Sequence, residues 1–245
     1  MSAQPSGKIQ RRANILRAAR ELMQADGDLS FSMRTLAEQA GVSIATPYNL
    51  FGSKQAILLA VLDADLEDFQ KTLASLEVDE IEVLFEAMRL MSSLLGGEPT
   101  FYRNVFRALA SDGPEFRFMV SGPRYLAWKR LLRQATEAGL LVDNVDPDAF
   151  AVVSSQLMVA TLLEWAQGGL SVEEMEARME YGLALTLLAI CTDRSRPHLE
   201  RHLHEAERKL QQQWRGMLMS RLRKGELDET TRELLADQLK HLNVK

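Results

Sequence analysis

The chain has 245 residues, 46% of them hydrophobic and 26% charged, a balance typical of a globular protein long enough to bury a core. Its one cysteine, Cys191, excludes an internal disulfide and favours a reducing, cytoplasmic location. Residues 1–7 are small and polar, and the longest uncharged apolar runs, 149–163 and 181–192, are shorter than the roughly 20 residues that cross a bilayer. We therefore expect neither a secretory signal nor a membrane partner.

The charge is divided unevenly along the chain. Residues 1–55 carry seven Lys or Arg and four Asp or Glu, a net charge of +3. Because the whole chain has a net charge of −5, the remaining residues have a net charge of −8. A basic end on an acidic body favours an orientation of that end toward a phosphate backbone, although a net of +3 is also compatible with an ordinary solvated helix face.

Apolar spacing predicts a first helix over residues 8–25, ended by the Asp-Gly-Asp sequence at 26–28. Residues 32–54 then predict a helix, a tight turn at Gly41 and a second short helix that Ser43 caps. This is the pattern of a helix-turn-helix. Ser53 begins a long fourth helix reaching about Leu76, without glycine or proline, which we expect to act as one rigid rod.

The run Thr35-Leu-Ala-Glu-Gln-Ala-Gly-Val-Ser, followed by Tyr48-Asn-Leu-Phe-Gly-Ser-Lys, resembles the N-terminal signature of the TetR family of bacterial transcriptional regulators. The resemblance covers about residues 8–62, and beyond it only the helical architecture is similar. It implies a repressor that binds a palindromic operator in double-stranded DNA as a homodimer and is released by a small-molecule effector. Pro47, inside the second short helix, departs from the pattern and removes one backbone donor within the first turn.

We expect the DNA contacts to come from the two short helices and the start of the fourth. Thr35 is placed for a phosphate and Lys54 offers a charge across the groove, while base edges would be read by small or polar side chains such as Asn49. Arg11 and Arg12 are weaker candidates. The full predicted set is Arg34, Thr35, Ser43, Ile44, Ala45, Thr46, Tyr48, Asn49 and Lys54.

The body is predicted to be helical throughout, which makes the fold class all-α. Expected helices cover 79–95, 101–110, a short piece between Gly113-Pro114 and Gly122-Pro123, 124–138, 146–167 and 171–191. Asp146 with Pro147, and Ser171 with Glu174, are helix-start signals. The predicted domains are a DNA-binding domain over 1–55, a ligand-binding and dimerisation domain over 56–194, and a C-terminal extension over 195–245.

The segments 147–167 and 172–191 are apolar on more than one face, so they predict an intersubunit four-helix bundle. The family resemblance implies an effector pocket among the middle helices, where aromatic, methionine and arginine side chains gather, although such stripes are also typical of plain core. The candidates are Phe85, Met88, Arg89, Phe101, Tyr102, Phe106, Tyr125, Trp128, Met158 and Trp165.

The extension from Pro197 is charged and amphipathic, is interrupted at Gly225, and ends in a helix starting near Asp228. Its apolar stripe needs a partner, either its own subunit, a second subunit or another protein. All four histidines lie here. His198 and His202 are four residues apart, which permits a metal site, but we expect a solvated charged face and predict no metal and no cofactor.

Because the body has no histidine to act as a general base, we predict no enzyme activity. The leading hypothesis is a ligand-responsive transcriptional regulator. Two alternatives remain at this stage: a helical scaffold or adaptor acting through its C-terminal extension, and a small-molecule-binding protein or enzyme without DNA binding.

Overall fold

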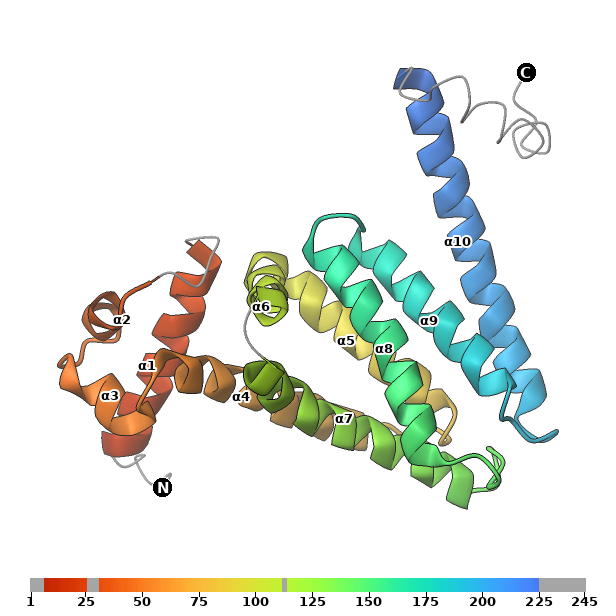
Figure 1. Cartoon of the computed structure of the whole chain (residues 1–245), viewed down its shortest axis with the longest axis horizontal. Helices are drawn as coiled ribbons and strands as arrows, with labels where there is room; N and C mark the ends of the chain where they lie inside the picture. The colour runs from red at the N-terminus through yellow and green to blue at the C-terminus, as the bar shows by residue number, and fades with distance from the viewer. Residues whose placement is uncertain (1–6, 26–30, 112–113, 225–245) are drawn as a thin grey trace.

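The computed structural model describes residues 7–25, 31–111 and 114–224, which form α-helices joined by short turns (Figure 1). No β-strand occurs within these ranges, where the one isolated bridge pairs Leu141 with Cys191. The all-α prediction is confirmed. The helices are α1 Gly7–Ala25, α2 Met33–Gln39, α3 Ala45–Phe51, α4 Lys54–Ala74, α5 Glu82–Gly97, α6 Pro99–Ser111, α7 Pro114–Glu137, α8 Pro147–Ala166, α9 Val172–Leu188 and α10 Arg196–Lys224.

The first three helices form a compact head at one end of the molecule, shown in red and orange in Figure 1. Ser32 caps α2 by accepting a hydrogen bond from the Thr35 backbone N–H at 3.0 Å. Gly41 makes the turn between α2 and α3 at φ +66°, a backbone conformation that residues other than glycine rarely adopt. The predicted helix-turn-helix is therefore present, with Gly41 at its turn.

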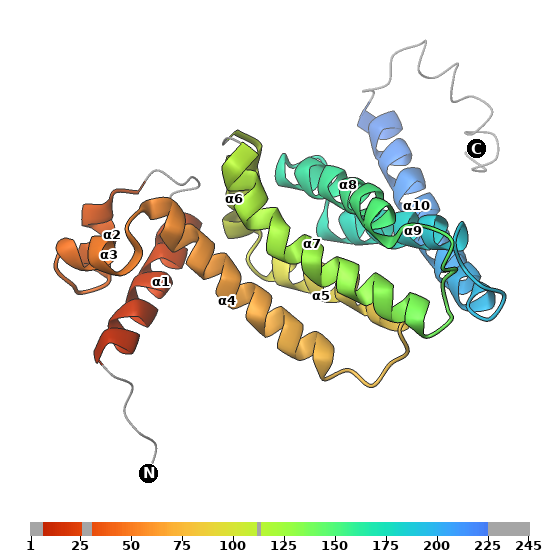
Figure 2. The same ribbon diagram turned by 60° about the horizontal axis from the view of Figure 1, so that its bottom comes forward.

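Helix α4 leaves the head and runs along the body without interruption (Figure 2). Ser53 begins it, because the Ser53 hydroxyl accepts a hydrogen bond from the Ala56 N–H at 3.1 Å. Ile57, Leu58 and Val61 are buried near its start, where α4 packs on α1. The expected rod thus belongs to the core of the head at one end and to the body at the other.

The helix starts of the body follow their local sequence signals. Asp146 caps α8 by accepting hydrogen bonds from the N–H groups of Asp148 and Ala149, and Ser171 with Glu174 forms the predicted capping box of α9. One prediction is wrong: no break occurs at Gly122-Pro123, and α7 continues through both residues. Proline removes a single hydrogen-bond donor from a helix, and the 24-residue α7 tolerates that loss.

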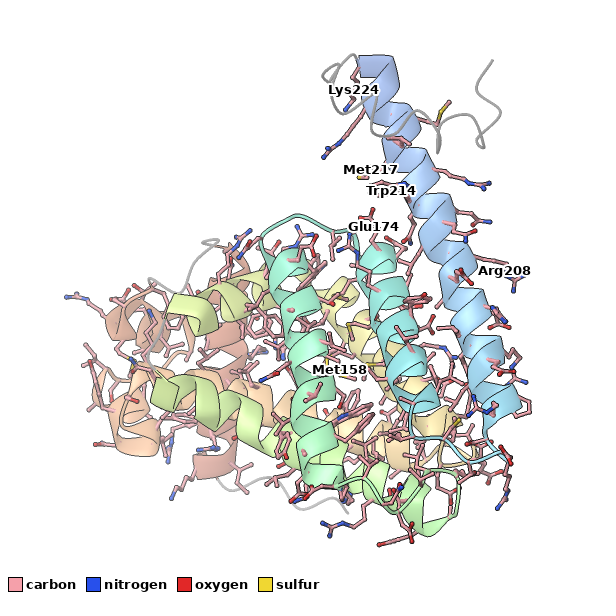
Figure 3. The ribbon with its side chains drawn as sticks, turned by 45° about the vertical axis from the view of Figure 1, so that its right-hand side comes forward. Met158, Glu174, Arg208, Trp214, Met217 and Lys224 are labelled. Atoms are coloured by element: carbon pink, nitrogen blue, oxygen red, sulfur yellow. The ribbon has the colours of Figure 1, made fainter. Side chains whose placement is uncertain are left out.

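Helix α10 packs against α9 and buries Leu199, His202 and Ala206. The extension therefore docks on its own subunit along this part of its length. In Figure 3, Trp214 and Met217 lie near the level of Glu174 at the start of α9, and Lys224 lies beyond the ends of the neighbouring helices. The expected last helix, near 228, is outside the described residues.

Apolar side chains remain exposed on α8, which is apolar over most of its length, and on the uncharged C-terminal half of α9. The exposed members are Val152, Val153, Leu157, Val159 and Leu185. By length and composition, α8 is also the one described helix that would suffice to cross a membrane, with 28% of its most apolar stretch buried. The uncharged run within α8 is shorter, at 149–163, because Asp148 and Glu164 lie on either side of it.

Candidate nucleic-acid interface

The outer surface of α3 and the turn before it is formed by residues that the sequence predicted as DNA contacts. Ser43, Ile44, Ala45, Tyr48 and Asn49 are exposed, and the two bulky members, Ile44 and Tyr48, have 53% and 51% of their surface accessible. The remaining face of α3 packs inward through Pro47, which is buried. A seven-residue helix thus presents its small, polar and aromatic side chains on one side.

Ser43 differs from its predicted role as a helix cap. Its hydroxyl lies 2.9 Å from the Thr46 hydroxyl, and no side-chain hydrogen bond caps the N-terminus of α3. The first turn is instead closed by the backbone, since the Thr46 N–H donates to the Ser43 carbonyl at 2.9 Å. Thr46 itself is half-buried, next to the exposed residues of α3.

Arg34 and Thr35 lie at the start of α2 and are exposed. The Thr35 hydroxyl is 2.8 Å from the Ser32 hydroxyl, and Arg34 forms an exposed ion pair of 3.1 Å with Glu38. Exposed pairs of this kind contribute little to stability, so the Arg34 guanidinium is able to exchange its partner for a phosphate.

Lys54 has a second role that the sequence did not indicate. Its Nζ donates to the Phe31 carbonyl at 2.8 Å and lies 4.2 Å from the centre of the Phe31 ring. Lys54 therefore ties the start of α4 to the segment before α2. Arg12 of α1 packs in a similar way on α3, with its guanidinium carbon 4.4 Å from the centre of the Phe51 ring.

A polar cluster joins the head to the body. Arg20 of α1 pairs with Asp65 of α4 and with Glu98, 2.8 Å away at the end of α5. Burial lowers the pKa of Arg20, but the carboxylates of Asp65 and Glu98 outweigh it and raise that pKa above its ordinary value. Asn104 of α6 also donates to the Met23 carbonyl at 3.1 Å. Helix α1 is thus hydrogen-bonded to the body through Arg20, Gln24 and the Met23 carbonyl.

The structure distributes the predicted effector contacts over several places. Phe85, Met88 and Arg89 lie on α5, where Arg89 is held by the carboxylates of Glu82, Glu86 and Glu180. Phe101 and Tyr102 lie beside Arg20, whose guanidinium is 4.6 Å from the centre of the Phe101 ring.

The remaining candidates lie between α6, α7 and α8. The Phe106 and Trp165 ring centres are 6.4 Å apart, and Trp128 donates to the Ser154 hydroxyl at 3.0 Å. Tyr125 donates to the Asp148 carbonyl at 3.3 Å, and Met158 is half-buried on α8. Phe106, Trp128 and Tyr125 thus each contact a residue of α8.

Two polar atoms in this region have no hydrogen-bond partner among the described residues. Trp165 is fully buried, and its Nε1–H is unpaired. The buried Nε of Arg103 is also unpaired, and the Arg103 guanidinium lies 5.1 Å from the centre of the Trp165 ring. Buried donors of this kind normally have partners, so a molecule bearing an acceptor would find two there.

Two cavities of about 460 and 420 Å³ lie elsewhere among the described residues, the first between α5, α9 and α10 and the second between α4 and α7. None of the ten predicted effector contacts lines either cavity.

A second cluster, which the sequence did not predict, joins α5 to α10. Glu82 accepts from His198 at 2.7 Å and from His202 at 3.0 Å, and His202 stacks on Phe85 with ring centres 3.7 Å apart. Burial raises the pKa of Glu82, but the hydrogen bonds from Arg89 and both histidines outweigh it and lower that pKa to about 2. Burial likewise lowers the pKa of His202. The predicted solvated histidine face is wrong for His202, which is 6% exposed.

Comparison with known proteins agrees with this geometry. Residues 15–61 match the family of bacterial regulatory proteins described as the tetR family. The transcriptional regulator EthR of Mycolicibacterium smegmatis is 28% identical over 191 residues, covering 74% of this chain and 87% of its own.

Solved structures share the fold. Thermus thermophilus FadR, a repressor in complex with lauroyl-CoA, has a TM-score of 0.62 at 22% identity and covers 74% of this chain and 95% of its own. Bacillus subtilis FadR in complex with stearoyl-CoA has a TM-score of 0.60 at 19% identity, with 73% and 98% covered.

A helix-turn-helix head on a helical body defines a DNA-binding transcriptional regulator. Its DNA-binding head, over residues 15–61, matches the TetR family of these regulators, and the chain as a whole is similar to a regulator of this kind. The adaptor alternative is accordingly not favoured.

Proposed function

We propose that the protein is a repressor that binds a palindromic operator as a homodimer and is released by a small molecule with an apolar body and a hydrogen-bond-accepting group. The observation that carries the proposal is the exposed row of Ser43, Ile44, Ala45, Tyr48 and Asn49 on one side of α3. Exposed apolar side chains on the head favour contact with a partner, and the methyl groups of thymine in a DNA groove suit Ile44 and Ala45.

Within this interface the residues divide by chemistry. Asn49 offers both a donor and an acceptor to an adenine edge, whereas Arg34, Thr35, Thr46, Tyr48 and Lys54 are placed for phosphates, which fix register but carry no sequence information. The proposed unit of DNA binding is residues 1–55, with effector binding and dimerisation in 56–194 and the extension in 195–245.

Dimerisation is proposed through α8 and α9. Val152, Leu157 and Leu185 are each about half exposed in the single chain. Pairing these two helices with their copies in a second subunit would bury this face in a four-helix bundle. Two heads held in one dimer bind two half-sites together, which compensates for the small contact area of one head.

The effector site is proposed beside Trp165 and Arg103. The unpaired Trp165 Nε1–H and Arg103 Nε–H favour a ligand with a carbonyl, carboxylate or phosphate oxygen, and the neighbouring Phe106 ring favours an apolar body. Because the two FadR structures hold acyl-CoA, which combines these features, lauroyl-CoA and stearoyl-CoA are the first molecules to test.

The test is selection of bound fragments from random and genomic DNA by the purified protein, followed by titration of the enriched duplex with the acyl-CoA series. A palindromic motif, and its release by one acyl-CoA, are the expected results. If no motif is enriched at low salt, the regulator proposal fails. A motif that no acyl-CoA releases would overturn the proposed ligand class alone.

A further inference from the structure

We propose that Glu82, His198 and His202 form a binding site for one divalent transition-metal ion of the zinc type, which would fasten α10 to α5. This site is separate from the DNA interface and from the proposed effector site. It joins residues 116 and 120 positions apart in the chain, so a bound ion would cross-link the extension to the body.

The ligand atoms converge on one point. Nε2 of His198 and Nε2 of His202 lie 2.7 and 3.0 Å from the same oxygen, Oε2 of Glu82, and the three ligand atoms all lie within 4.8 Å of one another. Ligands of tetrahedral zinc are about 3.3 Å apart, given metal–ligand bonds of about 2.0–2.1 Å. Retreat of the carboxylate by about half an ångström would therefore let an ion replace the two shared protons.

The spacing in the sequence produces this convergence. His198 and His202 lie one turn apart on α10, which places both rings on the same face of the helix. Their ring centres are 5.0 Å apart with the planes 21° from parallel, and the second ring is fixed against Phe85. Two histidines and one carboxylate, with a position left for water, are a set that zinc takes in proteins.

Surrounding charged groups already contact two of the three ligands, Glu82 and His198. Arg89 holds the other carboxylate oxygen of Glu82, Oε1, at 2.9 Å, which leaves Oε2 for the ion. Asp79 Oδ2 lies 3.5 Å from Nδ1 of His198, so its carboxylate is placed to hold the proton on that nitrogen while Nε2 binds metal. Metal-bound histidines usually donate their other ring N–H to a carboxylate, a backbone carbonyl or water.

The charge of the cluster also favours a cation. Its linked ion pairs contain the two cations Arg89 and Lys209 and five carboxylates, which leaves an excess of three negative charges at full ionisation. The carboxylates are those of Asp79, Glu82, Glu86, Glu176 and Glu180. A divalent ion at the histidines would offset most of this excess.

The test is calorimetric titration of the untagged, chelator-treated full chain with Zn²⁺, and visible absorption after loading with Co²⁺. We expect one ion per chain, an intense tetrahedral Co²⁺ band, and a higher melting temperature with Zn²⁺. His198→Ala and His202→Gln should each weaken Zn²⁺ binding about tenfold or more and remove the melting shift. Glu82→Gln should do the same.

The matched control is His204→Ala, since His204 lies on the same helix with its side chain 70% exposed. It should bind Zn²⁺ as the wild type does. Far-UV circular dichroism of each ion-free variant shows whether it folds, and His198→Ala, at a half-buried position, is the variant on which the result depends. The proposal is overturned if the wild type takes up no stoichiometric ion, if folded His198→Ala binds as tightly, or if His204→Ala loses binding equally.

Discussion

The Tyr102 hydroxyl donates a 2.8 Å hydrogen bond to Oδ2 of Asp65, while Arg20 pairs with the other oxygen of the same carboxylate. Three helices, α1, α4 and α6, therefore meet on one side chain. Burial and the hydrogen bond to Asp65 raise the pKa of Tyr102, so its hydroxyl stays protonated and acts as the donor. The head is thus attached to the body through α6 as well as through α4.

Tyr102→Phe should reduce the free energy of unfolding by about 2 kcal/mol, because it removes one part-buried hydrogen bond to a charged acceptor. Urea denaturation followed by circular dichroism measures this. The matched control is Tyr48→Phe on the exposed face of α3, which should leave stability unchanged but weaken operator binding. Equal stability of the two variants would show that the Asp65 contact contributes nothing.

Leu185→Glu should give monomers with normal helicity and without measurable operator binding, because a charge in the α8–α9 face cannot be buried in a bundle. Sedimentation equilibrium tests this. Val78→Glu, at an exposed apolar residue between α4 and α5, is the control and should remain dimeric. A Leu185→Glu dimer of wild-type strength would place the interface on other helices.

Lys54→Ala should weaken binding to specific and nonspecific DNA alike and lower the salt dependence, since one phosphate contact is lost. It should also destabilise the head by about 1 kcal/mol, because the bond to the Phe31 carbonyl disappears. Asn49→Ala is the contrasting variant: it should relax base preference and leave stability intact. Fluorescence anisotropy at several salt concentrations separates the two outcomes.

Gly-Gly inserted after Phe69 would interrupt α4 beyond the Asp65 cluster. If α4 carries the effector signal as a lever, the variant should bind operator but respond weakly to the effector, measured by operator titration with and without the releasing acyl-CoA. Normal release by the insertion variant would assign the signal to α6 and its contacts with Arg20 and Met23.

Much of the fold was predictable because its signals are local. The Asp146-Pro147 start, the Ser171–Glu174 capping box and the Gly41 turn each depend on residues within a few positions of one another. The break predicted at Gly122-Pro123 was wrong because contacts made by a long helix can outweigh the loss of one donor.

The candidate sites were harder to predict where they bring together residues that lie far apart in the sequence. The exposed row on α3 follows from the helix-turn-helix pattern, whereas the Glu82–His202 contact joins residues 120 apart and has no local signal. Arg89 was a reasonable effector contact by type, yet three carboxylates already surround it. The unpaired donor of Trp165 became visible only once its neighbours were placed.

Cys191 is the chain's only cysteine, and it is buried, with its thiol donating to the Leu188 carbonyl at 3.3 Å. A cysteine introduced at exposed Ser43 would therefore be the one readily labelled thiol in each subunit. Spin labels on the two copies would report the separation of the two heads directly by pulsed dipolar spectroscopy. The distance between the two heads, which determines the spacing of the operator half-sites, can thus be measured in solution without first replacing the native cysteine.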